Sequence, residues 1–215
     1  MAHSFSFDAA YYRRYYEDPK TRIYDRARHA HLIEGVMGLL AWFGWPVQSV
    51  LDVGAGVGWW KRWLARHRRD VRYVGTELEA STCRRYGLLQ ADVRDLRLDE
   101  TFDLVVCHGV LPYVDDAGLP KAIDNLAAMS HGFVYLEAIT KQDLTGSVDV
   151  TLTDTRVFHR PGAAYRALLE RHFLQVGAGL WAKRDAGIVF YELEVPPPAR
   201  RSGRRERRRS PSAAR

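Results

Sequence analysis

The feature that most limits what this chain can fold into is its alternation of short apolar segments with amphipathic ones. Five segments are rich in β-branched residues and apolar throughout, which is typical of strands covered on both faces. They span residues 49–53, 71–77, 88–92, 102–108 and 132–138. Because such strands alternate with helical segments through short connections, the sequence predicts an α/β fold with a doubly wound, mostly parallel sheet.

Three helices are predicted between and before these strands from apolar residues at helical spacing. Their stripes are Leu32, Val36, Leu39, Leu40 and Phe43; Trp59, Trp60, Trp63, Leu64 and His67; and Leu119, Ala122, Ile123, Leu126 and Ala127. We expect Gly44 and Pro46 to end the first helix and Asp115 or Asp116 to cap the third. Because the three tryptophans share one stripe, we expect them to pack in the core rather than contact a ligand.

The C-terminal part departs from this alternation. After Pro161 and Gly162 a further helix is predicted from Tyr165, Leu168, Leu169 and Phe173. Two extended runs follow, residues 173–181 and 186–195, joined by AKRDA. This pattern predicts a β-hairpin, so the complete sheet would hold seven strands, five parallel and an antiparallel pair.

Composition is that of one ordinary globular unit: 215 residues, 47% of them hydrophobic. No uncharged apolar run approaches the ~20 residues that cross a bilayer, and the start lacks a secretory pattern. We therefore expect a cytoplasmic protein with no membrane association. Cys83 and Cys107 have no CxxC spacing and the eight histidines form no ligand-like group, so we expect reduced thiols and no metal.

The positive charge of the chain is concentrated at its end. The last 17 residues hold eight arginines and one glutamate, and without them the formal net charge falls from +6 to −1. Residues 199–215 have no large apolar side chain, so we expect a disordered tail. A nucleic-acid partner is not expected from the nearly neutral body, although the tail leaves one open.

The loop after the first predicted strand, LDVGAGVGWW, is the strongest candidate for a ligand site. Open parallel sheets bind ligands beyond the carboxyl ends of their strands, and glycines let the main chain come close to a ligand. The spacing of Gly54, Gly56 and Gly58 reads GxGxG rather than the GxGxxG of dinucleotide-binding loops, which disfavours NAD. No GK[ST] follows, which excludes a P-loop.

This run resembles motif I of the class I S-adenosylmethionine-dependent methyltransferases. Three further runs resemble later motifs of that family in the same order: YVGTELEA, LQADVRDL and FDLVVCHGVLPYVDD. The match covers roughly residues 45–195, and four ordered motifs are far more specific than a lone glycine pattern. The resemblance implies a Rossmann-like methyltransferase fold, S-adenosyl-L-methionine as cofactor and S-adenosyl-L-homocysteine as product.

The resemblance also implies a set of cofactor-binding residues. The glycine loop would bend around the methionine part of the cofactor, Glu77 would bind the ribose hydroxyls and Asp92 the adenine amine. The full set is Asp52, Gly54, Ala55, Gly56, Gly58, Glu77, Leu78, Asp92, Val93, His108, Gly109 and Val110, with Tyr16 and Arg22 from the N-terminal segment.

The resemblance divides the chain into three parts: residues 1–30, 31–198 and 199–215. The first would close over the cofactor, as N-terminal segments commonly do in this family, the second is the methyltransferase domain and the third is the arginine-rich tail. The first part carries Tyr11, Tyr12, Tyr15, Tyr16 and Tyr24 together with Arg13, Arg14 and Arg22. Arg14 or Arg22 would hold a carboxylate of the cofactor or the substrate. An amphipathic helix lying on the body is the alternative for this segment.

Residues that bind the methyl acceptor or catalyse the transfer give a weaker sequence signal, because in-line methyl transfer needs few catalytic side chains. The ~20 residues between 139 and 160 exceed what a structural connection needs, so we expect a binding loop with Glu137, His159 and Arg160 at its edges. His108, His159 and Tyr11 are the candidate catalytic residues. The fourth motif lacks the [DN]PP[YF] and Pro-Cys patterns of adenine-N6, glutamine and cytosine-C5 methylation.

The function expected from these features is methyl transfer to an O, N or S atom of a small molecule, such as a specialised metabolite. Three alternatives stay open: methylation of RNA or of a protein or peptide, transfer or cyclisation of the aminocarboxypropyl group, and a non-catalytic cofactor-binding module. The sequence does not identify the acceptor, the attacked atom or the oligomeric state.

Overall fold

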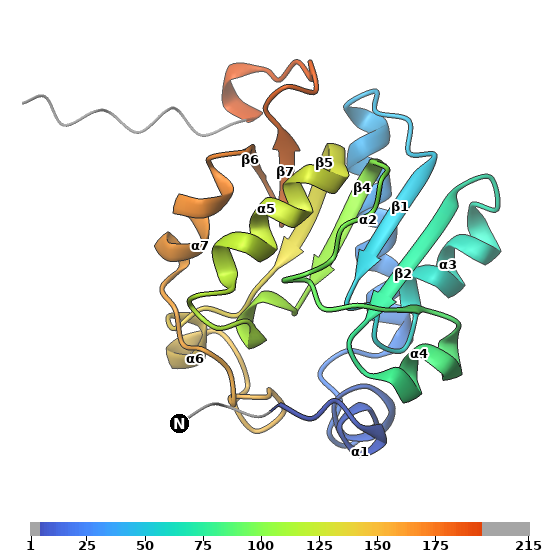
Figure 1. The fold of residues 1–215 in the computed structure, drawn as a ribbon, viewed down its shortest axis with the longest axis vertical. Helices are drawn as coiled ribbons and strands as arrows, with labels where there is room; N and C mark the ends of the chain where they lie inside the picture. The colour runs from blue at the N-terminus through green and yellow to red at the C-terminus, as the bar shows by residue number, and fades with distance from the viewer. Residues whose placement is uncertain (1–4, 195–215) are drawn as a thin grey trace, which may run out of the picture.

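A computed structural model describes residues 5–194 of the chain. Seven strands form one sheet in the order β3-β2-β1-β4-β5-β7-β6 (Figure 1). They are β1 (Ser49–Val53), β2 (Arg72–Glu77), β3 (Leu89–Gln90), β4 (Phe102–His108), β5 (Ser130–Glu137), β6 (Phe173–Gly177) and β7 (Leu180–Lys183). The first five strands pair in parallel, and β7 pairs antiparallel with both β5 and β6. The predicted fold class is confirmed.

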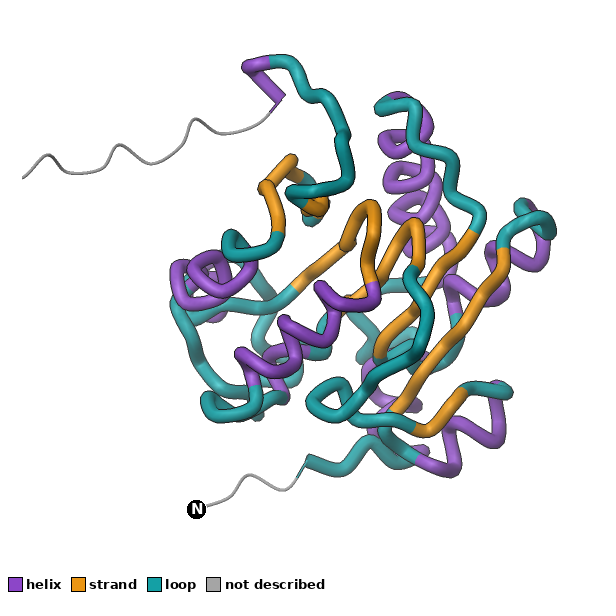
Figure 2. Tube along the Cα trace, turned by 45° about the horizontal axis from the view of Figure 1, so that its top comes forward, coloured by secondary structure: helices purple, strands orange, loops and turns teal. Residues whose placement is uncertain are grey.

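The helices cover both faces of the sheet. The α-helices are α1 (Ala9–Tyr12), α2 (Arg26–Trp42), α3 (Trp59–His67), α4 (Ala80–Tyr86), α5 (Leu119–Met129), α6 (Asp143–Gly146) and α7 (Gly162–Leu169), with short non-α helices η1 (Arg13–Glu17), η2 (Leu111–Tyr113) and η3 (Glu192–Glu194). Figures 1 and 2 show α5 and α7 on one face and α2 and α3 on the other. The sequence analysis did not predict α4.

The central strands alternate their side chains between two apolar layers. Leu51 of β1 and Val105 of β4 pack with α5 and α7, whereas Val50 and Leu104 pack with α2 and α3. All four side chains are fully buried. Both faces of the sheet are therefore shielded from water, which explains why these strands read as continuous apolar runs.

The predicted end of α2 is confirmed, whereas the predicted cap of α5 is not. The side chain of Asp25 accepts a hydrogen bond from the Arg28 amide at 2.8 Å and begins α2, and Gly44 follows its end at φ +70°. At the start of α5, Asp115 accepts from the Gly118 amide at 2.7 Å, while Asp116 forms an ion pair elsewhere. The N-cap residue of α5 is Gly118 and no side chain caps the helix, so the prediction that Asp115 or Asp116 caps it is wrong.

The C-terminal hairpin is shorter than predicted. The prediction of strands at residues 173–181 and 186–195 is wrong, because the chain already reverses between β6 and β7. Ala178 and Gly179 take positive φ angles of 49° and 79°, which makes a tight turn inside the run that we read as one strand. Residues 186–191 form no strand, although Phe190 packs against Phe43 and Phe133. The predicted tail, residues 199–215, lies outside the described residues.

Residues 5–25 lie across the carboxyl ends of the parallel strands, where Figure 1 places α1. Within residues 5–194, no helix is long and apolar enough to cross a membrane. In the same range, no group of three or more His, Cys, Asp or Glu side chains is placed to hold a metal ion. Cys83 and Cys107 are both buried free thiols.

Candidate functional site

Two adjoining cavities open at the carboxyl ends of β1, β2 and β4. The larger cavity has a volume of about 490 Å³ and runs from the glycine loop along Glu77 to Asp92. The smaller cavity, about 140 Å³, lies between the glycine loop, α2 and the end of β5. The two share the following lining residues: Tyr11, Tyr16, Gly54, Gly56, His108, Gly109 and Tyr113. A ligand in one cavity is therefore in reach of a ligand in the other.

The glycine loop runs along both cavities in a conformation that side chains disfavour. Gly54, Gly56 and Gly58 have φ angles of +69°, +53° and +71°. A Cβ atom on Gly54 would overlap Cγ2 of Val110, and one on Gly56 would stand 3.4 Å from the Tyr12 ring. Gly58 lines neither cavity and is the residue before α3. The first two glycines thus leave bare main chain where a ligand must come close.

Glu77 ends β2 beside this loop and is 6% exposed. Its carboxylate accepts hydrogen bonds from the Gly56 amide at 2.9 Å and the Leu78 amide at 2.7 Å. An ionised carboxylate has about four lone-pair positions, so beyond the two amides it can also accept from the Tyr12 hydroxyl and from a ligand hydroxyl. Burial and the Glu77 charge raise the pKa of the neighbouring Tyr12 hydroxyl, which stays protonated and can donate.

Asp92 lines the far end of the larger cavity, with Val93 beside it. Arg94 donates to both oxygens of Asp92, with its Nη2 at 2.6 Å from Oδ2, and this hydrogen bonding keeps the pKa of Asp92 below its usual value. The carboxylate is therefore ionised but already paired. Binding of an adenine amine by Asp92 stays a prediction, and it requires the carboxylate to share its lone pairs with Arg94.

Asp52 is buried beneath the glycine loop at 3% exposure and lines the smaller cavity. Burial raises its pKa to about 7, although the Tyr73 hydroxyl donates to it at 2.8 Å and opposes that rise. Near neutral pH the group is consequently shared between its protonated and ionised forms.

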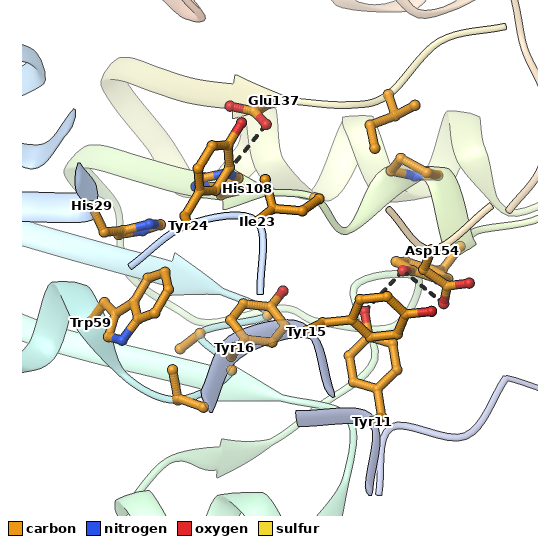
Figure 3. Close-up of a pocket in the computed structure, with 18 of the residues that line it drawn as sticks. Tyr11, Tyr15, Tyr16, Ile23, Tyr24, His29, Trp59, His108, Glu137 and Asp154 are labelled. Atoms are coloured by element: carbon orange, nitrogen blue, oxygen red, sulfur yellow. Dashed lines mark hydrogen bonds and ion pairs between the residues drawn. The ribbon is translucent and has the colours of Figure 1, made fainter. Parts of the chain in front are cut away.

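Two stacked imidazoles and a carboxylate form the polar side of the smaller cavity (Figure 3). Nε2 of His108 lies 3.4 Å from Oε1 of Glu137, and the Tyr135 hydroxyl donates to Oε2 at 3.3 Å. Burial alone would raise the pKa of Glu137, but the hydrogen bonds and charge of His108 and the Tyr135 hydroxyl lower it below its usual value. Glu137 is thus ionised and orients His108.

His29 stacks on the His108 ring at a centroid distance of 5.1 Å and an angle of 10°. It comes from α2 and is 8% exposed. Burial, with the nearby His108, lowers the pKa of His29 to about 3, so its imidazole is neutral at physiological pH. Its Nδ1 atom is buried without a hydrogen-bond partner.

Aromatic rings make the opposite wall of the smaller cavity. Figure 3 shows Tyr16 and Tyr15 in a row with Trp59, whose ring lies 5.6 Å from Tyr16 and 4.1 Å from His29 between centroids. The prediction that all three tryptophans pack in the core is wrong for Trp59. Trp60 packs in the core, although it also lines the cavity, and Trp63 packs against the core; Trp59, as the first residue of α3, is only partly buried and stands at the cavity.

The candidate catalytic residues are not brought together. His108 lines both cavities, whereas His159 is exposed, bonds the Thr155 carbonyl at 3.0 Å and lines neither. Its ring is turned away from the site, so it is no base there. Tyr11 lines both cavities, but its hydroxyl bonds the Tyr113 hydroxyl at 2.9 Å, and burial raises its pKa. Tyr11 therefore stays protonated, and it lines the cavities without acting as a general base.

The predicted arginines do not reach the site either. Arg22 lines neither cavity, and Arg14 lies over the outer side of the Tyr15 ring. Arg160 is buried and donates to Asp116 at 2.6 Å and to the Val114 carbonyl at 2.5 Å. It anchors the loop of residues 139–160 to the wall of the site rather than binding a ligand.

Sequence reasoning missed His29, Asp154 and Thr153 as lining residues of the smaller cavity. His29 lies on the buried side of α2, and its position at the same helical face as Ile33 and Val36 read as core. The other two lie within the predicted binding loop, without a local pattern that distinguishes them.

Comparison with known proteins agrees with this geometry. Residues 50–131 match a family model described as "Methyltransferase domain". The comparison of the sequence with curated proteins gave no significant match. Among solved structures, the PH0226 protein from Pyrococcus horikoshii OT3 shares 16% identity at a TM-score of 0.59, over 82% of this chain and 97% of that one.

Two further solved structures have similar scores. DesVI of Streptomyces venezuelae shares 19% identity at a TM-score of 0.56, over 72% of this chain and 90% of that one. The plantazolicin methyltransferase BpumL, solved with a monoazolic desmethylPZN analog and SAH, shares 12% identity at a TM-score of 0.56. The alignment covers 68% of this chain and 63% of BpumL, so the chain spans less than two thirds of that protein's length.

The fold, the glycine loop and the matching domain define an α/β protein of the Rossmann-like methyltransferase class. More narrowly, the match of residues 50–131 to a methyltransferase domain and the strand order support the predicted resemblance to the class I S-adenosylmethionine-dependent methyltransferases. The predicted fold is thereby confirmed, and the domain match supports the predicted family and cofactor. The residues of the larger cavity fit this cofactor: bare main chain at Gly54 and Gly56 for its methionine part, and a remaining acceptor position on Glu77 for its ribose.

Proposed function

We propose that this protein methylates an O, N or S atom of a small molecule that binds in the smaller cavity. The observation that carries the proposal is a His108–Glu137 pair inside an aromatic cavity that shares its floor, the glycine loop, with the cofactor cavity. When bound, S-adenosylmethionine supplies an electrophilic methyl group on a sulfonium. The chain itself holds the acceptor, excludes water and receives a proton.

His108 is the group that accepts this proton. Glu137 faces its Nε2 atom and stabilises the imidazolium that forms, as a carboxylate does for a catalytic histidine. The Tyr135 hydroxyl holds the second oxygen of Glu137 and fixes the orientation of the pair. Water is kept away by Tyr15, Tyr16 and Trp59 on one side of the cavity.

Binding of a small acceptor, rather than RNA or a protein, is supported by the enclosure of the cavity. Its walls come from the N-terminal segment, α2, η2 and the loop of residues 139–160, and Arg160 anchors that loop. The two buried free thiols fit a reducing compartment, so we place the protein in the cytoplasm as part of the same proposal.

A labelled-methyl experiment tests the proposal. The protein is incubated with methyl-labelled S-adenosylmethionine and with separate small-molecule, RNA and protein fractions of a cell extract, and products are analysed by mass spectrometry. Label in a small molecule is expected, lost in His108→Ala and kept in His159→Ala, which removes a histidine outside the cavities. Label only in RNA or protein, or transfer of an aminocarboxypropyl group, would contradict it.

A further inference from the structure

The smaller cavity is lined by carboxyl groups and by no permanently positive side chain. Its lining residues include the carboxyl groups of Asp52, Glu137 and Asp154 and no lysine or arginine. Asp154 is 7% exposed and is paired from outside by Arg156, whose Nε lies 2.9 Å from Oδ1. Asp52 is held by the Tyr73 hydroxyl beneath the glycine loop. Glu137, with 42% of its side chain exposed, is the carboxylate that a ligand in the cavity can reach.

His29 adds an unpaired polar atom to the same cavity. More than nine-tenths of the residue is buried, and its Nδ1 has no hydrogen-bond partner. Figure 3 shows its ring turned toward His108 and Tyr24. A buried polar atom without a partner costs about 1–3 kcal/mol, which a ligand that donates a hydrogen bond would recover once the ring turns this nitrogen into the cavity. A neutral imidazole has one nitrogen lone pair, so it can accept that bond.

The aromatic wall has the same preference for positive charge. Ring faces carry negative electrostatic potential and attract ammonium groups, most strongly tryptophan and tyrosine. Trp59, Tyr16, Tyr15 and Tyr24 all line the cavity. Their rings, the Glu137 carboxylate and the His29 lone pair therefore favour one kind of ligand, a cation that donates hydrogen bonds.

We propose, resting on the proposed function, that the methyl acceptor is a small amine. It binds as an ammonium ion that donates hydrogen bonds to Glu137 and His29 while its carbon skeleton packs against Trp59 and the tyrosines. The ammonium gives one proton to His108, and the freed nitrogen lone pair forms a bond to the methyl carbon. The carbon–sulfur bond breaks with its electrons going to sulfur, and the methylated product keeps one positive charge.

Matched one-ring probes test this class of acceptor. A cavity of about 150 Å³ holds a benzene ring, so a cavity of about 140 Å³ that adjoins the larger one suits the ring of benzylamine, benzyl alcohol or benzoate, with the substituent toward the shared lining residues. Binding of each is measured by calorimetry to protein saturated with S-adenosylhomocysteine at pH 7. Benzylamine is expected to bind about tenfold tighter than benzyl alcohol, because it forms charge-assisted hydrogen bonds and cation–π contacts, and benzoate should not bind.

Two variants test whether Glu137 causes the tighter binding of benzylamine. Glu137→Gln should bring benzylamine and benzyl alcohol to within about twofold of each other, because the charge-assisted bond is gone. Glu100→Gln is the matched control, since Glu100 pairs with Arg72 on the surface and lines neither cavity. Thermal unfolding confirms that each variant is folded, and the comparison of probes in the unchanged protein needs no variant.

The outcomes separate this proposal from the one on which it rests. Equal binding of alcohol and amine, preference for benzoate, or no probe binding while S-adenosylhomocysteine binds would overturn the amine acceptor and leave methyl transfer standing. If Glu137→Gln weakens S-adenosylmethionine alone, the carboxylate serves the sulfonium and the amine proposal fails. If S-adenosylhomocysteine itself does not bind, both proposals fail.

Discussion

Replacing Gly54 by alanine tests whether the close approach of the glycine loop to Val110 is needed for cofactor binding. Gly54 and Gly58 have nearly equal φ angles, +69° and +71°. An alanine at either position therefore meets the same left-handed strain, about 1–2 kcal/mol. Only at Gly54 does the added Cβ overlap another side chain, that of Val110, whereas at Gly58 the nearest atom is 3.8 Å away.

The overlap adds an overpacking cost of about 1–3 kcal/mol. Gly54→Ala should therefore lower the free energy of unfolding by about 2–5 kcal/mol, and Gly58→Ala by about 1–2 kcal/mol. Urea unfolding followed by circular dichroism measures both values. Because Gly54 and Val110 line the larger cavity and Gly58 does not, calorimetry should show weaker binding of S-adenosylhomocysteine only in Gly54→Ala. Equal losses in the two variants, or unchanged binding in Gly54→Ala, would refute the close-approach argument.

Three further predictions follow from the site. The pKa of His29 is about 3 in the folded state and about 6.5 in the unfolded state, so the unfolded chain binds a proton first as the pH falls. The free energy of unfolding should therefore decrease below pH 6.5, by about 2 kcal/mol at pH 5. Urea titrations of His29→Gln should lack this decrease. His108→Ala should lower kcat about 10²–10⁴-fold if His108 is the base, whereas a kcat equal to that of His159→Ala would exclude it. Glu77→Ala should weaken S-adenosylhomocysteine binding about tenfold or more in calorimetry, and an unchanged Kd would mean that Glu77 does not bind the ribose.

The parts of the fold that local pattern controls were predictable. β1 and β4 match the predicted residues 49–53 and 102–108, because strands buried on both faces are continuous apolar runs between polar loops. The glycine loop was identifiable because left-handed backbone at Gly54 and Gly56 requires glycine, whatever the rest of the chain does. Glu77 was placed by the resemblance of YVGTELEA to a family motif whose acidic residue ends the second strand.

The site residues that were not predicted depend on contacts between distant parts of the chain. His29 reaches His108 across 79 sequence positions, and no local spacing records that approach. Trp59 and Trp60 are adjacent, chemically identical and both line the cavity, yet Trp59 is only partly buried whereas Trp60 is buried in the core, because the helix turns by 100° between them. His108 and His159 were equally good candidate bases by sequence, because the path of the loop that carries His159 is not encoded in a local pattern.

On the proposed function, the N-terminal rings bear on how each catalytic cycle ends. Tyr12 is 5% exposed and lies over Gly56 in the larger cavity, while Tyr11 and Tyr16 wall both cavities. Lifting residues 5–17 away uncovers both chambers at once. Spent cofactor and methylated product would then depart through one shared exit, and the frequency of that opening would cap turnover however fast the chemistry becomes.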